Sequence, residues 1–184
     1  MDDYAVQVLP GVVAQFMKEH PEIDVEVTSG FSDRLVTRLG IDFDLVLSTH
    51  PVGEGKGHIL RHEETKWAFG ADMPLPESDV LALALLPPGN IFRRWGLRAL
   101  QGAGLQSRVA FTGSSISTVE AAASAGIGVT VVKESTANKS LRFIGEERGL
   151  PPLPKTEIAL NRSSATESRQ ARVFADYTIA FLSL

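Results

Sequence analysis

The spacing of hydrophobic residues predicts alternating helices and strands in the first quarter of the chain. An apolar stripe within residues 12–17 follows Pro10, and predicts a helix that ends near His20-Pro21. Apolar and polar residues alternate in Ile23–Thr28, which predicts a strand with one exposed face. Ser32 is expected to cap a short helix. The apolar segment Asp44–Ser48 predicts a buried parallel strand.

The same alternation continues to the end of the chain. The pattern predicts strands at 65–71, 80–86, 109–112, 129–132 and 158–160 and helices at 91–100, 117–125 and 167–182, with 134–150 unassigned. Asn90 is expected to cap one helix, and Ser117-Thr118-Val119-Glu120 reads as a capping box for the next. In the last helix the inward residues are expected to be Val173, Phe174, Tyr177 and Phe181.

Strands alternating with helices predict an α/β protein with parallel sheets covered on both faces. Two such groups are present, separated at the strand 65–71 and again at the proline-rich segment 151–155. We therefore expect lobe I at 1–71 and 156–184, with lobe II at 72–155 inserted into it. Two crossing segments would join these Rossmann-like lobes.

Composition narrows the functional classes. The chain has 184 residues, 43% hydrophobic, with a net charge of −4 and no cysteine. A weakly acidic chain is not expected to bind DNA by itself. The absence of cysteine excludes disulfides and thiolate chemistry and favours a reducing, cytoplasmic setting. The start Met1-Asp2-Asp3-Tyr4 lacks the basic region of a signal peptide, and no apolar run is long enough to predict a membrane span.

Charge is unevenly distributed between the two halves of the chain. Residues 1–92 hold six Lys and Arg against 15 Asp and Glu, whereas residues 93–184 hold 12 against seven. Solvated surfaces explain this difference in the simplest way. Complementary charge between two antiparallel copies is the alternative.

Three turns have a composition that suits anion binding. Thr28–Ser32, Pro87–Asn90 and Thr112–Ser117 each follow a predicted strand, contain glycine, and lead into a predicted helix. The carboxyl ends of parallel strands and the free N–H groups at helix starts favour a small anion such as a carboxylate. Each turn alone is ordinary helix capping, so the hypothesis needs them to converge. Arg93 or Arg94 could face the same anion, or simply be solvated.

The other candidate chemistry is weaker, and no metal or cofactor is expected. His58 and His62, next to Glu63, have metal-ligand spacing for a helix, but their segment leads into a strand and fits surface histidines better. Gly-Ser-Ser at Ser114-Ser115 is not a nucleophile elbow, and glycine-rich nucleotide motifs are absent from the sequence. Trp67 and Trp95 are expected in the core rather than as stacking platforms.

A family resemblance rests on the order and spacing of several short motifs. They are Leu9-Pro10, Phe16, His20-Pro21, Val25-Glu26-Val27, Gly30-Phe31-Ser32, Leu35, Leu39, Asp44-Leu45-Val46 and the helix Ala121-Ala122-Ala123-Ser124-Ala125 followed by Gly126-Ile127-Gly128-Val129. In this order they resemble the effector-binding domain of LysR-type transcriptional regulators, over nearly the whole chain.

The resemblance implies a type-2 periplasmic-binding-protein fold with a small-molecule cleft between its lobes and an antiparallel homodimer. The effector-binding positions carry over to Ser29, Ser32, Thr49, His50, Pro88, Gly89, Asn90, Arg93, Thr112, Gly113, Ser114 and Ser115. The dimer interface carries over to the helix at 10–17 and the helix at 117–125, with Val13, Met17, Val119, Ala122 and Ala123 as contacts.

The expected function is therefore sensing, not catalysis. The resemblance implies a winged helix-turn-helix, a linker helix and a first sheet strand ahead of these residues, so we expect the chain to be part of a longer regulator. DNA would be bound only through that missing domain, by a dimer or a tetramer. A free-standing solute-binding protein with the same fold is the alternative, and an enzyme is the least favoured, since the sequence displays no nucleophile–base pair.

Overall fold

A computed structural model of the chain describes residues 2–75, 78–163 and 168–182. Its contacts group into two compact units: unit 1 is Met1–Glu63 with Lys155–Leu184, and unit 2 is Glu64–Pro154. The sequence pattern predicts that the chain passes from the first lobe to the second after residue 71. In the structure the strand Thr65–Gly70 (β3) is already grouped with unit 2. The return crossing near residue 155 lies where the prolines end.

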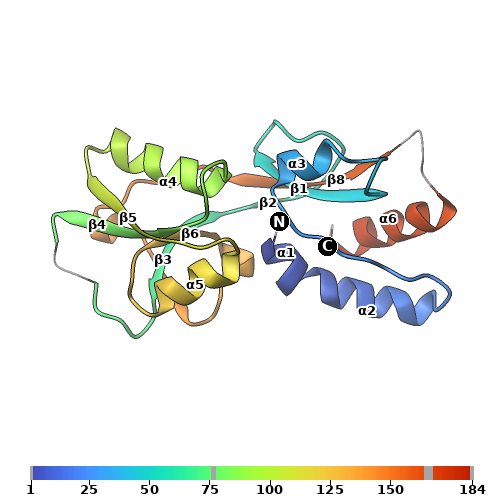
Figure 1. Cartoon of the computed structure of the whole chain (residues 1–184), viewed down its shortest axis with the longest axis horizontal. Coiled ribbons are helices and arrows are strands. Elements are labelled where there is room, and N and C mark those ends of the chain that lie inside the picture. Colours follow the sequence, from blue (N-terminus) through green and yellow to red (C-terminus); the bar gives the residue numbers. More distant parts are fainter. Residues whose placement is uncertain (1, 76–77, 164–167, 183–184) are drawn as a thin grey trace. The chain divides into compact units, whose positions relative to one another are not determined.

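Unit 1 is a three-stranded antiparallel sheet with helices around it (Figure 1). Its elements are α1 (Asp2–Gln7), α2 (Leu9–Glu19), α3 (Ser32–Val36), β1 (Leu45–Pro51), β2 (His58–Glu63), β8 (Thr156–Arg162) and α6 (Arg169–Leu182). The strand order is β1-β8-β2, so the returning strand β8 is the central one. Helix α6 packs on β8 and β2, α2 packs on α6, and α3 packs beside β1.

The core of unit 1 follows from the helical stripe that the sequence displays. Val12 and Phe16 are fully buried. The Phe16 ring meets the rings of Phe174 and Tyr177 edge-on, with centroids 4.8 and 5.3 Å apart. Such edge-to-face pairs add to the free energy gained by burying apolar area. The prediction of a helix over this stripe is confirmed, and α2 continues to Glu19.

Several predictions for unit 1 are wrong in detail. The strand at 44–48 exists as β1 but is antiparallel to β8. Ser32 is the first residue of α3 and does not cap it, because the N-cap position belongs to Phe31. Phe181 is 44% exposed, whereas Phe174 and Tyr177 pack against the core of unit 1 as expected. The predicted start of that helix at 167 falls outside the described residues.

The predicted strand Ile23–Thr28 is also wrong, for a tertiary reason. Its alternating residues form no ladder with any described strand. A groove of about 390 Å³ in unit 1 is lined by this segment, by residues 42–47, and by residues of α1, α2 and α6. A strand is stabilised by hydrogen bonds to a neighbouring strand, and here a groove lies between the segment and β1.

Unit 2 has helices on both faces of its strands (Figure 1). Its elements are β3, β4 (Val80–Leu85), α4 (Ile91–Gly102), β5 (Gln106–Thr112), α5 (Ile116–Ser124), β6 (Thr130–Lys133), the 3-10 turn Glu134–Thr136, β7 (Leu141–Ile144) and the 3-10 turn Glu146–Arg148. β3 pairs antiparallel with β6 and β7, and β4 pairs parallel with β5. The parallel arrangement predicted for the sheets is thus confirmed for β4 and β5, and Leu83 of β4 forms a further parallel bridge to Val129, just before β6.

Strand alternation divides the core of unit 2 into two halves. Trp67 and Phe69 of β3 join the cluster that contains Phe92 and Trp95 of α4. Ala68, which lies between them in sequence, joins the cluster of α5 instead. Successive strand residues point to opposite faces, so small residues face the alanine-rich α5 and large ones face α4. The core positions expected for Trp67 and Trp95 are confirmed.

The helix starts of unit 2 confirm one predicted cap and correct the other. Asn90 Oδ1 accepts hydrogen bonds from Phe92 N at 2.9 Å and Arg93 N at 3.2 Å, as a cap should. Helix α5 begins at Ile116, one residue earlier than expected, and its cap is Ser115 instead of Ser117. Glu120 therefore does not complete a capping box; its carboxylate accepts from Asn138 N at 3.1 Å. Val80 begins β4 and is 41% exposed, so this strand is buried only in its later part.

Candidate functional site

Two of the three predicted turns meet at one edge of unit 2. Strands β4 and β5 are parallel, with Leu85 opposite Thr112, so the loops 86–90 and 112–115 leave the sheet side by side. Gly113 N donates to Leu85 O at 3.1 Å and joins the two loops. Helices α4 and α5 both start there, capped by Asn90 and Ser115. This is the edge at which α/β sheets bind ligands.

Arg93 brings a positive charge to the same edge. Its Nη1 donates to Leu86 O at 2.9 Å and lies 3.5 Å from Thr112 Oγ1. A guanidinium has five N–H donors, and the remaining ones have no hydrogen-bond partner among the residues that the structure describes. Arg93 is half-buried, whereas its neighbour Arg94 is exposed. Between the two arginines, Arg93 is therefore the one held at the loops.

The other predicted residues of unit 2 shape this edge. Gly113 is buried, and a Cβ there would lie 3.0 to 3.1 Å from three neighbouring side chains, which would have to shift to admit a larger residue. Gly89 has φ +98°, a conformation that favours glycine. Ser115 Oγ is engaged by Thr118 N at 3.3 Å. Pro88 and Ser114 are exposed in the two loops.

The third predicted turn, Thr28–Ser32, lies in unit 1. Its Ser32 meets Thr49, another residue predicted to bind the effector. Thr49 N donates to Ser32 Oγ at 2.9 Å and ties β1 to the start of α3. Thr49 is 7% exposed, and its Oγ1 has no hydrogen-bond partner among the described residues. A buried hydroxyl without a partner is costly, so it marks a place where a guest could supply one. Ser29 is exposed and makes no such contact.

His50 belongs to a hydrogen-bonded chain on the other face of β1. Its Nε2 lies 2.6 Å from Ser48 Oγ, which accepts from Asn161 Nδ2 at 2.7 Å. Burial lowers the pKa of His50, while the carboxylates of Glu157 and Glu54 oppose that effect. A histidine with a lowered pKa is mostly neutral at pH 7 and offers hydrogen bonds rather than charge.

The Ser48–His50 pair was not foreseen from the sequence. It has the composition of a nucleophile and a base, and its distance suits a proton transfer. Ser48, however, is fully buried and already bonded to Asn161, so it does not present its oxygen to a substrate. The hydrogen bond with Ser48 therefore orients the His50 ring.

The predicted dimer contacts divide into accessible and inaccessible ones. Met17 is 38% exposed and Val13 is half-buried, so α2 can offer them to a partner. Val119, Ala122 and Ala123 are instead buried in the α5 cluster of unit 2, where they pack against the core of their own unit. Their i, i+3, i+4 spacing is that of the helix face turned to its own core. The exposed face of α5 carries Ser117, Thr118 and Ala121.

The histidine pair of the sequence lies in β2. His58 is opposite Leu160 and His62 is opposite Glu157, with a bulge between them. Among the residues that the structure describes, no three His, Cys, Asp or Glu side chains are grouped to hold a metal ion. His62 Nε2 lies 3.6 Å from Glu157 Oε2.

A comparison with protein families identifies the chain. The LysR substrate binding domain matches residues 1–182. The chain belongs to this family. Two transcriptional regulators are similar to this LysR domain: PecT of Dickeya dadantii, 31% identical over 88% of this chain, and DgdR of Burkholderia cepacia, 30% identical over 98%. The domain spans 52% and 62% of the lengths of these relatives.

Two solved structures with the same fold are a regulatory domain and an effector-binding domain. The CcmR regulatory domain of Synechocystis PCC6803 in complex with 2-PG has a TM-score of 0.75 at 18% identity and covers 98% of this chain and 93% of its own. The effector-binding domain of QuiR in complex with shikimate has a TM-score of 0.70 at 14% identity, covering 97% and 92%. The LysR domain therefore has the type-2 periplasmic-binding-protein fold, as the resemblance implied.

The family membership changes the weight of the alternatives. Relatives that are transcriptional regulators are consistent with a domain that is not an enzyme, and they do not favour a free-standing solute-binding protein. Within the described part of the chain, every helix is too short or too polar to cross a membrane.

Two buried polar residues next to His50 were not predicted from the sequence. Glu157 and Asn161 lie in β8, where every residue from Thr156 to Asn161 is buried. Polar side chains in an otherwise apolar strand are a signal that could have singled them out, because buried polar groups need partners. Their partners come from β1 and the loop after it, about 100 residues away in sequence.

Proposed function

We propose that this LysR domain binds a small organic anion and thereby controls DNA binding and transcription by the regulator of which it is a part. Arg93 carries the proposal: a half-buried guanidinium with unused donors, held at an edge where two helices begin. Arginine suits carboxylates because its planar fork can donate two parallel hydrogen bonds. The complexes of CcmR with 2-PG and of QuiR with shikimate support a small-molecule effector.

At its own predicted effector positions, unit 1 offers neutral hydrogen-bonding groups. Ser32, the buried Thr49 hydroxyl and His50 carry no fixed charge at pH 7, given the lowered pKa of His50. An anionic group suits Arg93 of unit 2, and hydroxyl or carbonyl groups suit the neutral residues of unit 1. We therefore propose a hydroxyl-bearing carboxylate or phosphate as the effector class.

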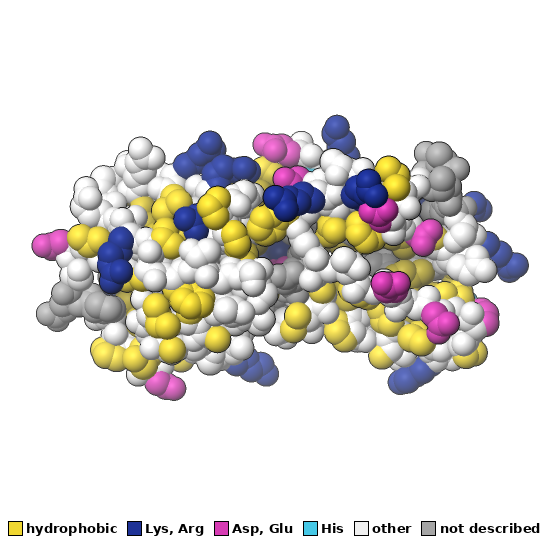
Figure 2. Space-filling model, viewed as in Figure 1, with side chains coloured by type: hydrophobic (Ala, Val, Ile, Leu, Met, Phe, Trp, Pro, Cys, Tyr) yellow, Lys and Arg dark blue, Asp and Glu magenta, His cyan; other side chains and the backbone are white. Residues whose placement is uncertain are grey.

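The proposed control of DNA binding follows from differential affinity. An effector can shift a regulator between two arrangements only by binding one of them more tightly. We propose a homodimer as the assembly that carries this change, with exposed residues of α2 and α5 at its interface. On the face shown in Figure 2, acidic, basic and apolar side chains are interspersed.

Calorimetric titration with 2-PG and with shikimate tests the ligand class. We expect saturable binding of one or both by the domain, weakened at least about tenfold by Arg93→Gln, since a charged hydrogen bond contributes roughly 1.5–3 kcal/mol. Arg94→Gln is the matched control, because Arg94 is adjacent and exposed. Equal weakening by both variants, or none by Arg93→Gln, would contradict the role given to Arg93.

A further inference from the structure

One carboxylate of unit 1 sits in a row with two histidines across the sheet. Glu157 in the central strand β8 is directly opposite His50 of β1 and directly opposite His62 of β2. Directly opposed residues of antiparallel strands project from the same face with their Cβ atoms about 5 Å apart. Glu157 is 3% exposed, so its charge is compensated within the protein.

The compensation comes mainly from the backbone of the loop between β1 and β2. Gly53 N donates to Glu157 Oε2 at 2.9 Å, and Gly55 N donates to Glu157 Oε1. These two N–H groups, together with His62 and His50, lower the pKa of Glu157 against the effect of its burial. Both carboxylate oxygens are therefore bound to the loop that begins at Val52, two residues after His50.

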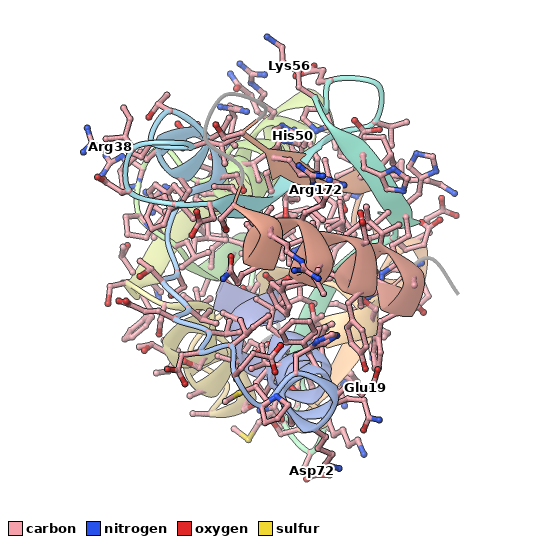
Figure 3. All side chains as sticks on the ribbon, turned by 90° about the vertical axis from the view of Figure 1, so that its right-hand side faces the viewer. Glu19, Arg38, His50, Lys56, Asp72 and Arg172 are labelled. Carbon is pink, nitrogen blue, oxygen red and sulfur yellow. The ribbon has the colours of Figure 1, made fainter. Side chains whose placement is uncertain are left out.

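The glycines of this loop are required by its close approach to β8. A Cβ on Gly55 would lie 2.5 Å from Glu157 Oε1. Gly57 has φ +106°, and a Cβ there would lie 2.6 Å from Leu160 O. The lack of side chains at these glycines thus lets the loop backbone contact β8 and the Glu157 carboxylate. In Figure 3, His50 lies beneath Lys56, which projects outward from this loop.

We propose that Glu157 is a positioning residue of the effector site: by binding the N–H groups of Gly53 and Gly55, it fixes the loop after β1 and the placement of His50. The proposal rests on the proposed function in treating His50 as an effector ligand. Glu157 would not touch the effector, because both of its oxygens are bound to the loop.

Amide hydrogen exchange measured by NMR tests the anchor. In Glu157→Gln the side chain loses its charge, and one of the two N–H groups faces an amide NH2 instead of an oxygen. Exchange at Gly53 and Gly55 should then rise about tenfold or more. Glu147→Gln is the matched control, since Glu147 Oε1 accepts from Gly145 N at 2.8 Å on the exposed surface of unit 2. Unchanged exchange at Gly53 and Gly55 in Glu157→Gln would overturn the proposal.

The titration of His50 gives a readout that a merely structural role would not move. Glu157 favours the protonated imidazole, so Glu157→Gln should shift the His50 midpoint to lower pH. An unchanged midpoint would contradict the placement of His50 against Glu157. If Glu157→Gln does not fold, Gly55→Ala decides: its Cβ must separate loop and carboxylate and raise exchange, whereas Gly11→Ala, with open space around it, should not.

Effector binding separates this proposal from the proposed function. If the unaltered domain binds neither 2-PG nor shikimate, the ligand class fails, while exchange and titration still decide the role of Glu157. If it binds either one, Glu157→Gln should weaken that binding at least fivefold and Glu147→Gln should not. Equal affinity of Glu157→Gln would overturn the positioning role.

Discussion

Gly96 of α4 packs directly against the indole ring of Trp67. A Cβ at Gly96 would lie 3.2 Å from Cη2 of Trp67 and 3.0 Å from a methyl carbon of Val131. Both neighbours are buried in the α4 half of the unit 2 core, so neither can move without disturbing that core. The helix approaches the sheet closely there because position 96 has no side chain.

Gly96→Ala should therefore destabilise unit 2. Overpacking of a filled core costs about 1–3 kcal/mol, which exceeds the gain of up to about 1 kcal/mol from replacing a helical glycine. Gly102→Ala in the same helix is the control, since nothing lies within 4 Å of its Cβ position. Urea unfolding should show a lower free energy for Gly96→Ala and an equal or higher one for Gly102→Ala. The opposite order would show that the core of unit 2 yields easily.

Tyr4→Phe should destabilise unit 1. The Tyr4 hydroxyl donates to the buried carboxylate of Glu63 and accepts from Arg61 Nε at 2.7 Å. Removing it leaves Glu63 with one donor fewer at a buried position, at a cost of about 1–3 kcal/mol. Thermal unfolding measures the change. Tyr177→Phe, which loses only an exposed 3.3 Å hydrogen bond to Glu19, should stay within about 0.5 kcal/mol of the unaltered protein.

Ser115→Ala should destabilise helix α5 more than Ser117→Ala does. The Ser115 hydroxyl is the cap that accepts from Thr118 N, whereas Ser117 lies inside the helix. Loss of a serine cap costs about 1 kcal/mol. Chemical unfolding of the two variants measures this difference. A larger loss for Ser117→Ala would restore the helix start that the sequence pattern predicts.

The contribution of Glu157 to stability should depend on pH in the acidic range. Its folded pKa lies below the usual value of 4.5, chiefly because Gly53 N donates to it. The unfolded chain therefore binds this proton more tightly, so the stabilisation is complete above about pH 4.5 and is lost as pH falls through the folded pKa.

Urea unfolding of the unaltered protein and of Glu157→Gln between pH 7 and pH 3 measures this dependence. The unaltered protein should be more stable at pH 7, and the gap should narrow steadily below about pH 4.5. A gap that stays constant down to pH 3 would show that the carboxylate is not held in its charged form.

Local sequence signals predicted much of the secondary structure. Helix α2 follows from its apolar stripe, the Asn90 cap from its side chain, and β3 from alternating large and small residues. The segment Ile23–Thr28 has an equally clear alternation but forms no ladder, because a strand depends on a neighbour that its own sequence does not describe. Residues 134–150, without a clear period, contain β7 and two 3-10 turns.

For the candidate site, too, some features follow from the sequence and others only from the folded structure. The residue types and their order along the chain by themselves determined the α/β class, the family, and the turns at Pro87–Asn90 and Thr112–Ser115 that carry an anion-binding composition. Only the tertiary structure decided that Arg93 rather than Arg94 is held at those turns, that α5 turns Val119, Ala122 and Ala123 inward, and that Glu157 holds the loop after β1. The reason is physical: periodicity records which side of an element is apolar, whereas a hydrogen bond across a hundred residues exists only once the chain has folded.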